Sequence, residues 1–128
     1  MRRLAIIILF LPLVVSMNGW IGRCLSESPG GDYVCRARTD IVAPCFEVRG
    51  RLSFWNGAPS ARIWPVGSKR MLGVHADVLP PALAAKKDGF DIELWALFTV
   101  CPLTRSQPQH MQFVCIESWR NLSVRQRE

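Results

Sequence analysis

The sequence has very few of the side chains and spacings from which metal and catalytic sites are built. It contains only two histidines, His75 and His110, and no two of its cysteines are separated by two residues. Because a zinc site normally needs closely spaced cysteines or several histidines, we expect no metal. No cofactor-binding motif, internal repeat or low-complexity segment occurs either. We therefore expect no cofactor, and no motif assigns a catalytic residue.

Only one apolar run is long enough to suggest targeting, and it lies at the N-terminus. Two arginines at positions 2 and 3 precede the apolar run 4–15, which has the length of a signal-peptide core rather than of a bilayer span. We predict a signal peptide over residues 1–19, with the cleavage site undefined, and export to the periplasm or the extracellular space. If cleavage fails, residues 4–21 would anchor the protein in the inner membrane, which is the alternative.

The charge is basic but modest. Lysine and arginine number 16 against 10 acidic residues, and loss of the two leader arginines leaves 14 against 10, a net charge of about +4. Such a charge gives weak attraction to anionic surfaces and is smaller than a nucleic-acid-binding surface requires. We expect an anionic envelope polymer or a protein as partner, and no nucleic acid; a membrane would be a partner only if the leader is retained.

Five cysteines follow the leader, and in a small exported protein they predict structural disulfides. An odd number leaves one without a partner in the same chain. Cys101 and Cys115 lie in neighbouring predicted strands, so we predict this pair first and Cys24–Cys35 second. Cys45 would then be the odd cysteine, although spacing alone does not determine connectivity.

Residues 20–44 are rich in glycine, serine, proline and charge and predict an irregular N-terminal arm. Residues 45–128 predict a single β-rich domain. In residues 45–54, apolar Phe46, Val48, Leu52 and Phe54 alternate with polar side chains, as in a half-buried strand. Gly50 falls on the apolar side, which indicates either a bulge or a close approach of another backbone.

The rest of the domain predicts four further strands and one short helix. Asn56-Gly57 predicts a turn after the first strand. The further strands are expected at 61–66, 71–74, 90–101 and 110–118, the helix at 79–87, and a basic tail that could add one edge pairing at 119–127. This order predicts a mainly β fold, a small antiparallel OB-like Greek-key barrel, with a transthyretin-like or immunoglobulin-like sandwich as the alternative.

Two segments carry a resemblance to a known family. They are GRLSFWNGAPSARIWPVGSKRMLGV, residues 50–74, and VCPLT with the later MQFVC, residues 100–115. They resemble an uncharacterised family of small exported bacterial β-rich proteins. The resemblance implies a bacterial exported protein and supplies no activity, substrate or catalytic residue.

Basic and aromatic side chains alternate in the first three predicted strands. The candidate ligand-binding residues are Arg49, Arg51, Arg62, Trp64, Lys69 and Arg70. Such combinations on OB-like barrels bind single-stranded nucleic acid or oligosaccharide through charge and stacking. The simpler interpretation is that these arginines form the solvated reverse of the core-facing strand.

Two groups of side chains could support catalysis. Cys101 or Cys115 activated by His110 would be a thiol nucleophile, but disulfide formation would consume the thiols. Asp91 and Glu93 could form a carboxylate pair, but solvent-facing alternation also accounts for them. We therefore predict a non-enzymatic exported binding module of unknown ligand. The alternatives are an enzyme with cysteine and histidine chemistry and a membrane-tethered accessory protein.

Overall fold

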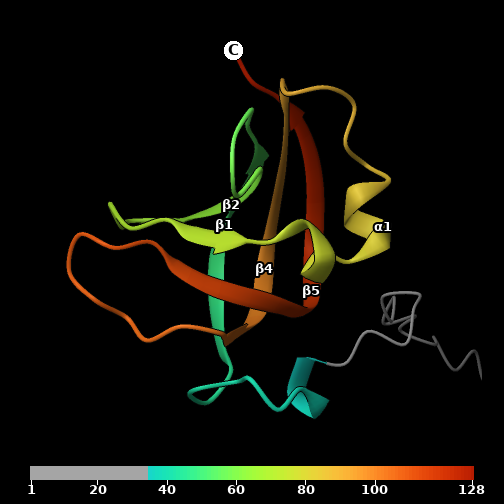
Figure 1. Ribbon diagram of the computed structural model, residues 1–128. Helices are drawn as coiled ribbons and strands as arrows, with labels where there is room; N and C mark the ends of the chain where they lie inside the picture. The colour runs from blue at the N-terminus through green and yellow to red at the C-terminus, as the bar shows by residue number, and fades with distance from the viewer. Residues whose placement is uncertain (1–34) are drawn as a thin grey trace, which may run out of the picture.

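The computed structural model describes residues 35–128, which form a β-barrel with short helical segments (Figure 1). The predicted signal peptide, most of the predicted arm and Cys24 lie outside the described residues. The elements in chain order are η1 (Cys35–Ala37), β1 (Phe46–Phe54), β2 (Ala61–Pro65), β3 (Leu72–Val74), η2 (Ala76–Val78), α1 (Pro81–Ala84), β4 (Ile92–Pro102) and β5 (Gln112–Gln126). None of these helices has the length and apolar character needed to cross a membrane.

The sheet closes on itself in the order β1-β2-β3-β5-β4. β1 pairs antiparallel with both β2 and β4, whereas β3 and β5 are parallel. The prediction of a mainly β barrel with one short helix is confirmed, and the strand order fits an OB-like barrel. The prediction that all strands pair antiparallel was wrong for one pair, β3 and β5. Five strands that alternate in direction around a ring must leave one parallel pair.

The core fills the inside of this ring. Alternate residues of the strands point inward, and Leu52, Ile63, Leu94, Phe98 and Val114 are fully buried. These inward positions follow the period of two that strand geometry imposes. One residue predicted for the core is not buried: Phe46, at the start of β1, is partly exposed.

Gly50 allows β1 and β2 to come close together. A Cβ atom at this position would lie 2.6 Å from the carbonyl oxygen of Trp64 and 3.1 Å from Cγ2 of Ile63. Neither of the two strands could keep its path with a side chain here. Of the two explanations for Gly50, the structure supports the close approach of a second backbone.

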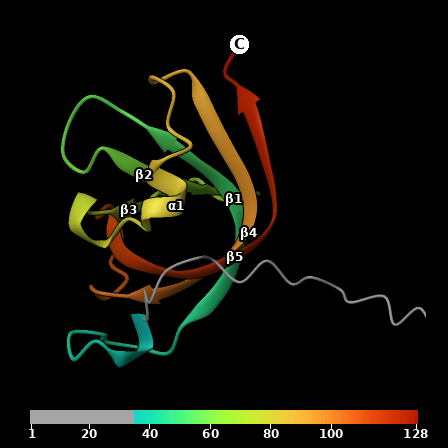
Figure 2. The same ribbon diagram turned by 90° about the vertical axis from the view of Figure 1, so that its right-hand side faces the viewer.

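The helix between β3 and β4 is shorter than predicted. The segment expected at 79–87 is helical in α1 only from Pro81 to Ala84, and η2 precedes it. Leu83 is its one fully buried residue, and Figure 2 shows α1 in front of the centre of the ring. A single apolar anchor in a four-residue helix suffices to cover this end of the barrel.

β5 is longer than predicted because the basic tail belongs to it. The β4–β5 ladder runs from Ile92 opposite Gln126 to Pro102 opposite Val114, with two register shifts. One shift lies between Trp95 and Leu97. Opposite it, β5 contains Asn121 in a left-handed conformation, with φ 57°. A bulge of this kind bends a strand and changes where its side chains point.

Two disulfides connect the barrel to the segment before it, and the predicted pairs were wrong. Cys35 bonds to Cys115 and Cys45 bonds to Cys101, so Cys45 is not the odd cysteine. Cys101 and Cys115 are cross-strand neighbours, as predicted. Each is bonded to a third segment instead, because β1 brings Cys45 beside β4 and η1 brings Cys35 beside β5.

Candidate binding face

The outer surface of the barrel carries tryptophan and arginine side chains in register on neighbouring strands. Arg51 of β1 lies opposite Trp64 of β2 on one side and Trp95 of β4 on the other. Trp95 lies in turn opposite Ser123 of β5. Directly opposed side chains on one face of a sheet lie within contact distance of each other, so these four residues form a row across four strands.

Each tryptophan of this surface has an arginine over its ring. Arg51 Cζ lies 5.4 Å from the ring centroid of Trp64, and Arg125 Cζ lies 5.2 Å from that of Trp95. Trp55, in the β1–β2 turn, has both Arg62 and Arg127 over its ring, at 5.7 and 4.4 Å. These are cation–π distances. We call this surface the arginine–tryptophan face: Arg51, Trp55, Arg62, Trp64, Trp95, Arg125 and Arg127.

A buried carboxylate holds part of this face together. Glu93 Oε1 accepts hydrogen bonds from Arg51 Nη1 at 3.0 Å and Arg127 Nε at 3.4 Å. Its Oε2 accepts from Trp95 Nε1 at 3.3 Å. The Glu93 side chain is only 8% exposed. The interpretation of Asp91 and Glu93 as a solvent-facing pair was therefore wrong, because Asp91 is exposed whereas Glu93 is enclosed by its cationic partners.

Buried polar atoms without a hydrogen-bond partner gather on the same face. Within residues 35–128 they are Ser53 Oγ, Trp55 Nε1, Trp64 Nε1 and Arg127 Nη2. Buried polar atoms usually have partners, because leaving one unsatisfied costs free energy. Their concentration here distinguishes this surface from the rest of the described barrel.

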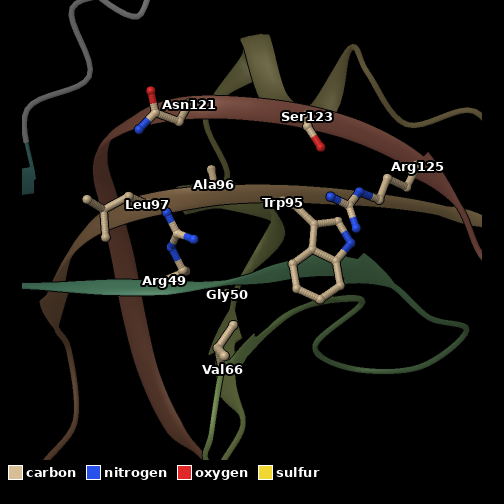
Figure 3. A pocket seen from close by; sticks show the side chains of 9 residues that line it. All are labelled: Arg49, Gly50, Val66, Trp95, Ala96, Leu97, Asn121, Ser123 and Arg125. Atoms are coloured by element: carbon tan, nitrogen blue, oxygen red, sulfur yellow. The ribbon is translucent and has the colours of Figure 1, made fainter.

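A hollow of about 390 Å³ adjoins the face. Its floor includes the small residues Gly50 and Ala96, and its walls include Arg49 and Trp95 (Figure 3). Figure 3 shows Arg49 extending from β1 toward β4, with the Trp95 ring and the Arg125 side chain at the other end. We call it the Trp95 hollow; its lining residues are Arg49, Gly50, Val66, Trp95, Ala96, Leu97, Asn121, Ser123 and Arg125.

The candidate residues from the sequence divide into two groups. Arg51, Arg62 and Trp64 lie on the arginine–tryptophan face and Arg49 lines the hollow, so the structure brings these four together. Lys69 and Arg70 are exposed in the β2–β3 turn. There the Arg70 guanidinium donates to Ser106 Oγ of the β4–β5 connector, away from the tryptophans.

Four residues of the face were not among the predicted binding residues: Trp55, Trp95, Arg125 and Arg127. Trp95 and Glu93 alternate with core residues in β4, and this period of two was the available signal for them. Arg125 and Arg127 have exposed neighbours, so the sequence around them carries no such signal. What the sequence did not reveal is that β4 pairs with β1, which places these side chains beside Arg49 and Arg51.

The positions considered for catalysis have other roles in the fold. Both Cys101 and Cys115 are in disulfides, and a disulfide sulfur is not a nucleophilic thiolate. His75 stacks on Phe113 with 4.3 Å between ring centroids, and His110 is exposed in the β4–β5 connector. Among residues 35–128, no group of three histidine, cysteine, aspartate or glutamate side chains is placed to hold a metal ion.

No family model, curated protein or solved structure matches the chain.

Proposed function

We propose that the protein is an exported, non-enzymatic binding module that takes an anionic component of the cell envelope on the arginine–tryptophan face. The observation that supports the proposal best is the gathering of stacked arginine and tryptophan side chains on one outer surface, next to a hollow. A guanidinium that stacks on an indole keeps its N–H edge available for oxyanions. Such a surface combines flat apolar area with positive charge.

The two disulfides support export. Disulfides persist in oxidising compartments such as the periplasm and are rare in the cytosol. Cys35–Cys115 and Cys45–Cys101 both join segments far apart in the sequence, so in such a compartment both would stabilise the folded barrel. With the leader pattern of residues 1–19 and the resemblance to small exported bacterial proteins, the proposed ligand is one that an envelope contains.

The proposal is tested with two variants that lose the same charge in different places. Arg49→Ser with Arg125→Ser removes two cations at the hollow, and Lys69→Ser with Arg70→Ser removes two from the β2–β3 turn. We expect the first variant to elute from dextran sulfate and from a polyphosphate resin at clearly lower salt than the second. Equal elution of the two variants would show that net charge alone accounts for binding, and would refute the proposal.

A further inference from the structure

The arginines of this surface differ in how much of their hydrogen-bonding capacity is already used. Arg51 and Arg127 donate to Glu93, and Arg62 Nε donates to the carbonyl oxygen of Pro59 at 3.1 Å. These three position the tryptophans. Among the described residues, Arg49 and Arg125 form no ion pair, and both are exposed. Arg49 and Arg125 are thus the guanidinium groups whose donors are open to a ligand.

Both of these arginines line the Trp95 hollow. The backbones of Gly50 and Ala96, opposite each other on β1 and β4, form part of its floor, and the outward-facing side chains around them form its walls. Its volume of about 390 Å³ lies at the small end of the range for ligand sites. It therefore suits one ring-sized group of a longer molecule rather than a folded partner.

The remaining walls supply an aromatic platform and neutral polar groups. Trp95 is held by its hydrogen bond to Glu93 and by Arg125 over its ring, so its orientation is set before a ligand arrives. Asn121 and Ser123 line the hollow from the bulged part of β5. The Asn121 amide and the Ser123 hydroxyl can both donate to and accept from the hydroxyl groups of a ligand. A ligand with hydroxyl groups therefore matches these two side chains better than a uniformly charged chain would.

We propose that the Trp95 hollow binds one uronic acid unit of an acidic polysaccharide. The sugar ring stacks on Trp95, its hydroxyls bond Asn121 and Ser123, and its carboxylate is held by Arg49 and Arg125. Guanidinium groups bind carboxylates through paired N–H donors, which makes the contact directional as well as electrostatic. This inference rests on the proposed function and specifies its ligand.

A single-stranded nucleic acid would also use arginine and tryptophan. Two observations favour the glycan. The disulfides indicate an oxidising compartment, and the hollow offers hydroxyl-matching groups beside only two uncommitted cations. A nucleic acid would instead require a continuous positive path along its backbone.

The test uses the full mature chain and trigalacturonate, with binding measured by isothermal titration calorimetry. The comparison ligands are the same trisaccharide with its carboxyls reduced, a hexathymidylate and polyphosphate. We expect trigalacturonate to bind and the reduced sugar to bind at least about tenfold more weakly, since the charge-assisted bonds are lost. Arg49→Ser with Arg125→Ser should give a loss of similar size, whereas Lys69→Ser with Arg70→Ser should change affinity less than about threefold.

A second set of variants tests the platform without relying on charge. Trp95→Phe should keep part of the affinity and Trp95→Ala should lose about tenfold or more, because stacking is removed. Asn121→Gly together with Ser123→Ala removes the neutral polar groups, and glycine keeps the left-handed bulge position. Near-UV circular dichroism of each variant shows whether the barrel is intact.

The outcomes separate this inference from the proposed function. Binding of trigalacturonate that fails in the hollow variants and survives in the turn variant supports both. Binding of hexathymidylate or polyphosphate through the same residues, without trigalacturonate binding, overturns the uronate assignment and leaves an anion-binding module. If none of these anionic ligands binds, both proposals are wrong.

Discussion

Glu93 should contribute far more to stability than an exposed carboxylate with an ion pair of its own. Its side chain is 8% exposed and accepts from two arginines and an indole N–H. A hydrogen bond to a charged group contributes about 1.5–3 kcal/mol to stability, and removing one of the two groups costs most when the other stays buried without a new partner. The arginines are 36% and 28% exposed and regain water, which reduces the loss. For Glu93→Gln, which keeps one acceptor oxygen, we expect unfolding to become easier by about 2 kcal/mol.

The measurement is urea unfolding with the disulfides intact, followed by tryptophan fluorescence. The control is Glu47→Gln, because Glu47 pairs with Arg120 at 2.9 Å but both side chains are more than half exposed. The control should lose about 0.5 kcal/mol or less. For a domain of this size, about 2 kcal/mol corresponds to a fall of roughly 10 °C in Tm. Equal midpoints for the two variants would refute the reasoning that the buried carboxylate organises the face.

Gly50→Ala should lower the unfolding free energy by about 1–3 kcal/mol, because the new Cβ meets a backbone oxygen that cannot rotate away; an unchanged urea midpoint would contradict this. Replacing Cys35 and Cys115 together by serine should cost about 4 kcal/mol on a loop-entropy basis for a separation of 80 residues, and a much smaller loss in urea would count against it. The Arg38 guanidinium donates hydrogen bonds to Asp40 and lowers the pKa of that carboxyl. The contribution of this pair to stability is therefore present above the ordinary pKa of an aspartate and is lost as the pH falls through the lowered pKa of Asp40. Arg38→Ala should raise the pKa of Asp40 in an NMR titration; an unmoved value would exclude the bond.

The sequence was informative about strands and much less so about helices. Alternation of polar and apolar residues identified β1 and the turn at Asn56-Gly57 because both signals are local. The helix was overestimated because the residues after Ala84 favour helix formation, yet only Leu83 has a core position to fill. Local preference without tertiary burial did not extend the helix.

Disulfide connectivity depends on positions that are set by the whole fold. The cysteines at 101 and 115 are indeed adjacent on paired strands, which was the basis of the wrong pairing. Their actual partners approach from outside that pair: Cys45 through the β1–β4 ladder and Cys35 through η1. Neither approach leaves a local trace in the sequence, because both join segments that are brought together only by the tertiary fold.

The site was half predictable for a related reason. Arg49, Arg51, Arg62 and Trp64 lie on two consecutive strands, so a hairpin prediction was enough to place them together. The other half of the face comes from β4 and the end of β5. These segments reach the hairpin only because β4 pairs with β1 on the opposite side from β2.

Gly50 connects the architecture to the site. Its missing side chain lets the backbone of β2 approach, and the amide of Val66 then donates to the carbonyl oxygen of Arg49 at 2.8 Å. On the other side Gly50 pairs with Ala96, and the backbones of these two residues form part of the floor between Arg49 and Trp95. A larger residue at position 50 would therefore disturb strand packing and the shape of the hollow together. Loss of ligand binding in Gly50→Ala would therefore not by itself show that Gly50 contacts the ligand. The side chains of Arg49 and Arg125 are exposed, so substitutions at these two positions can separate an effect on binding from an effect on folding.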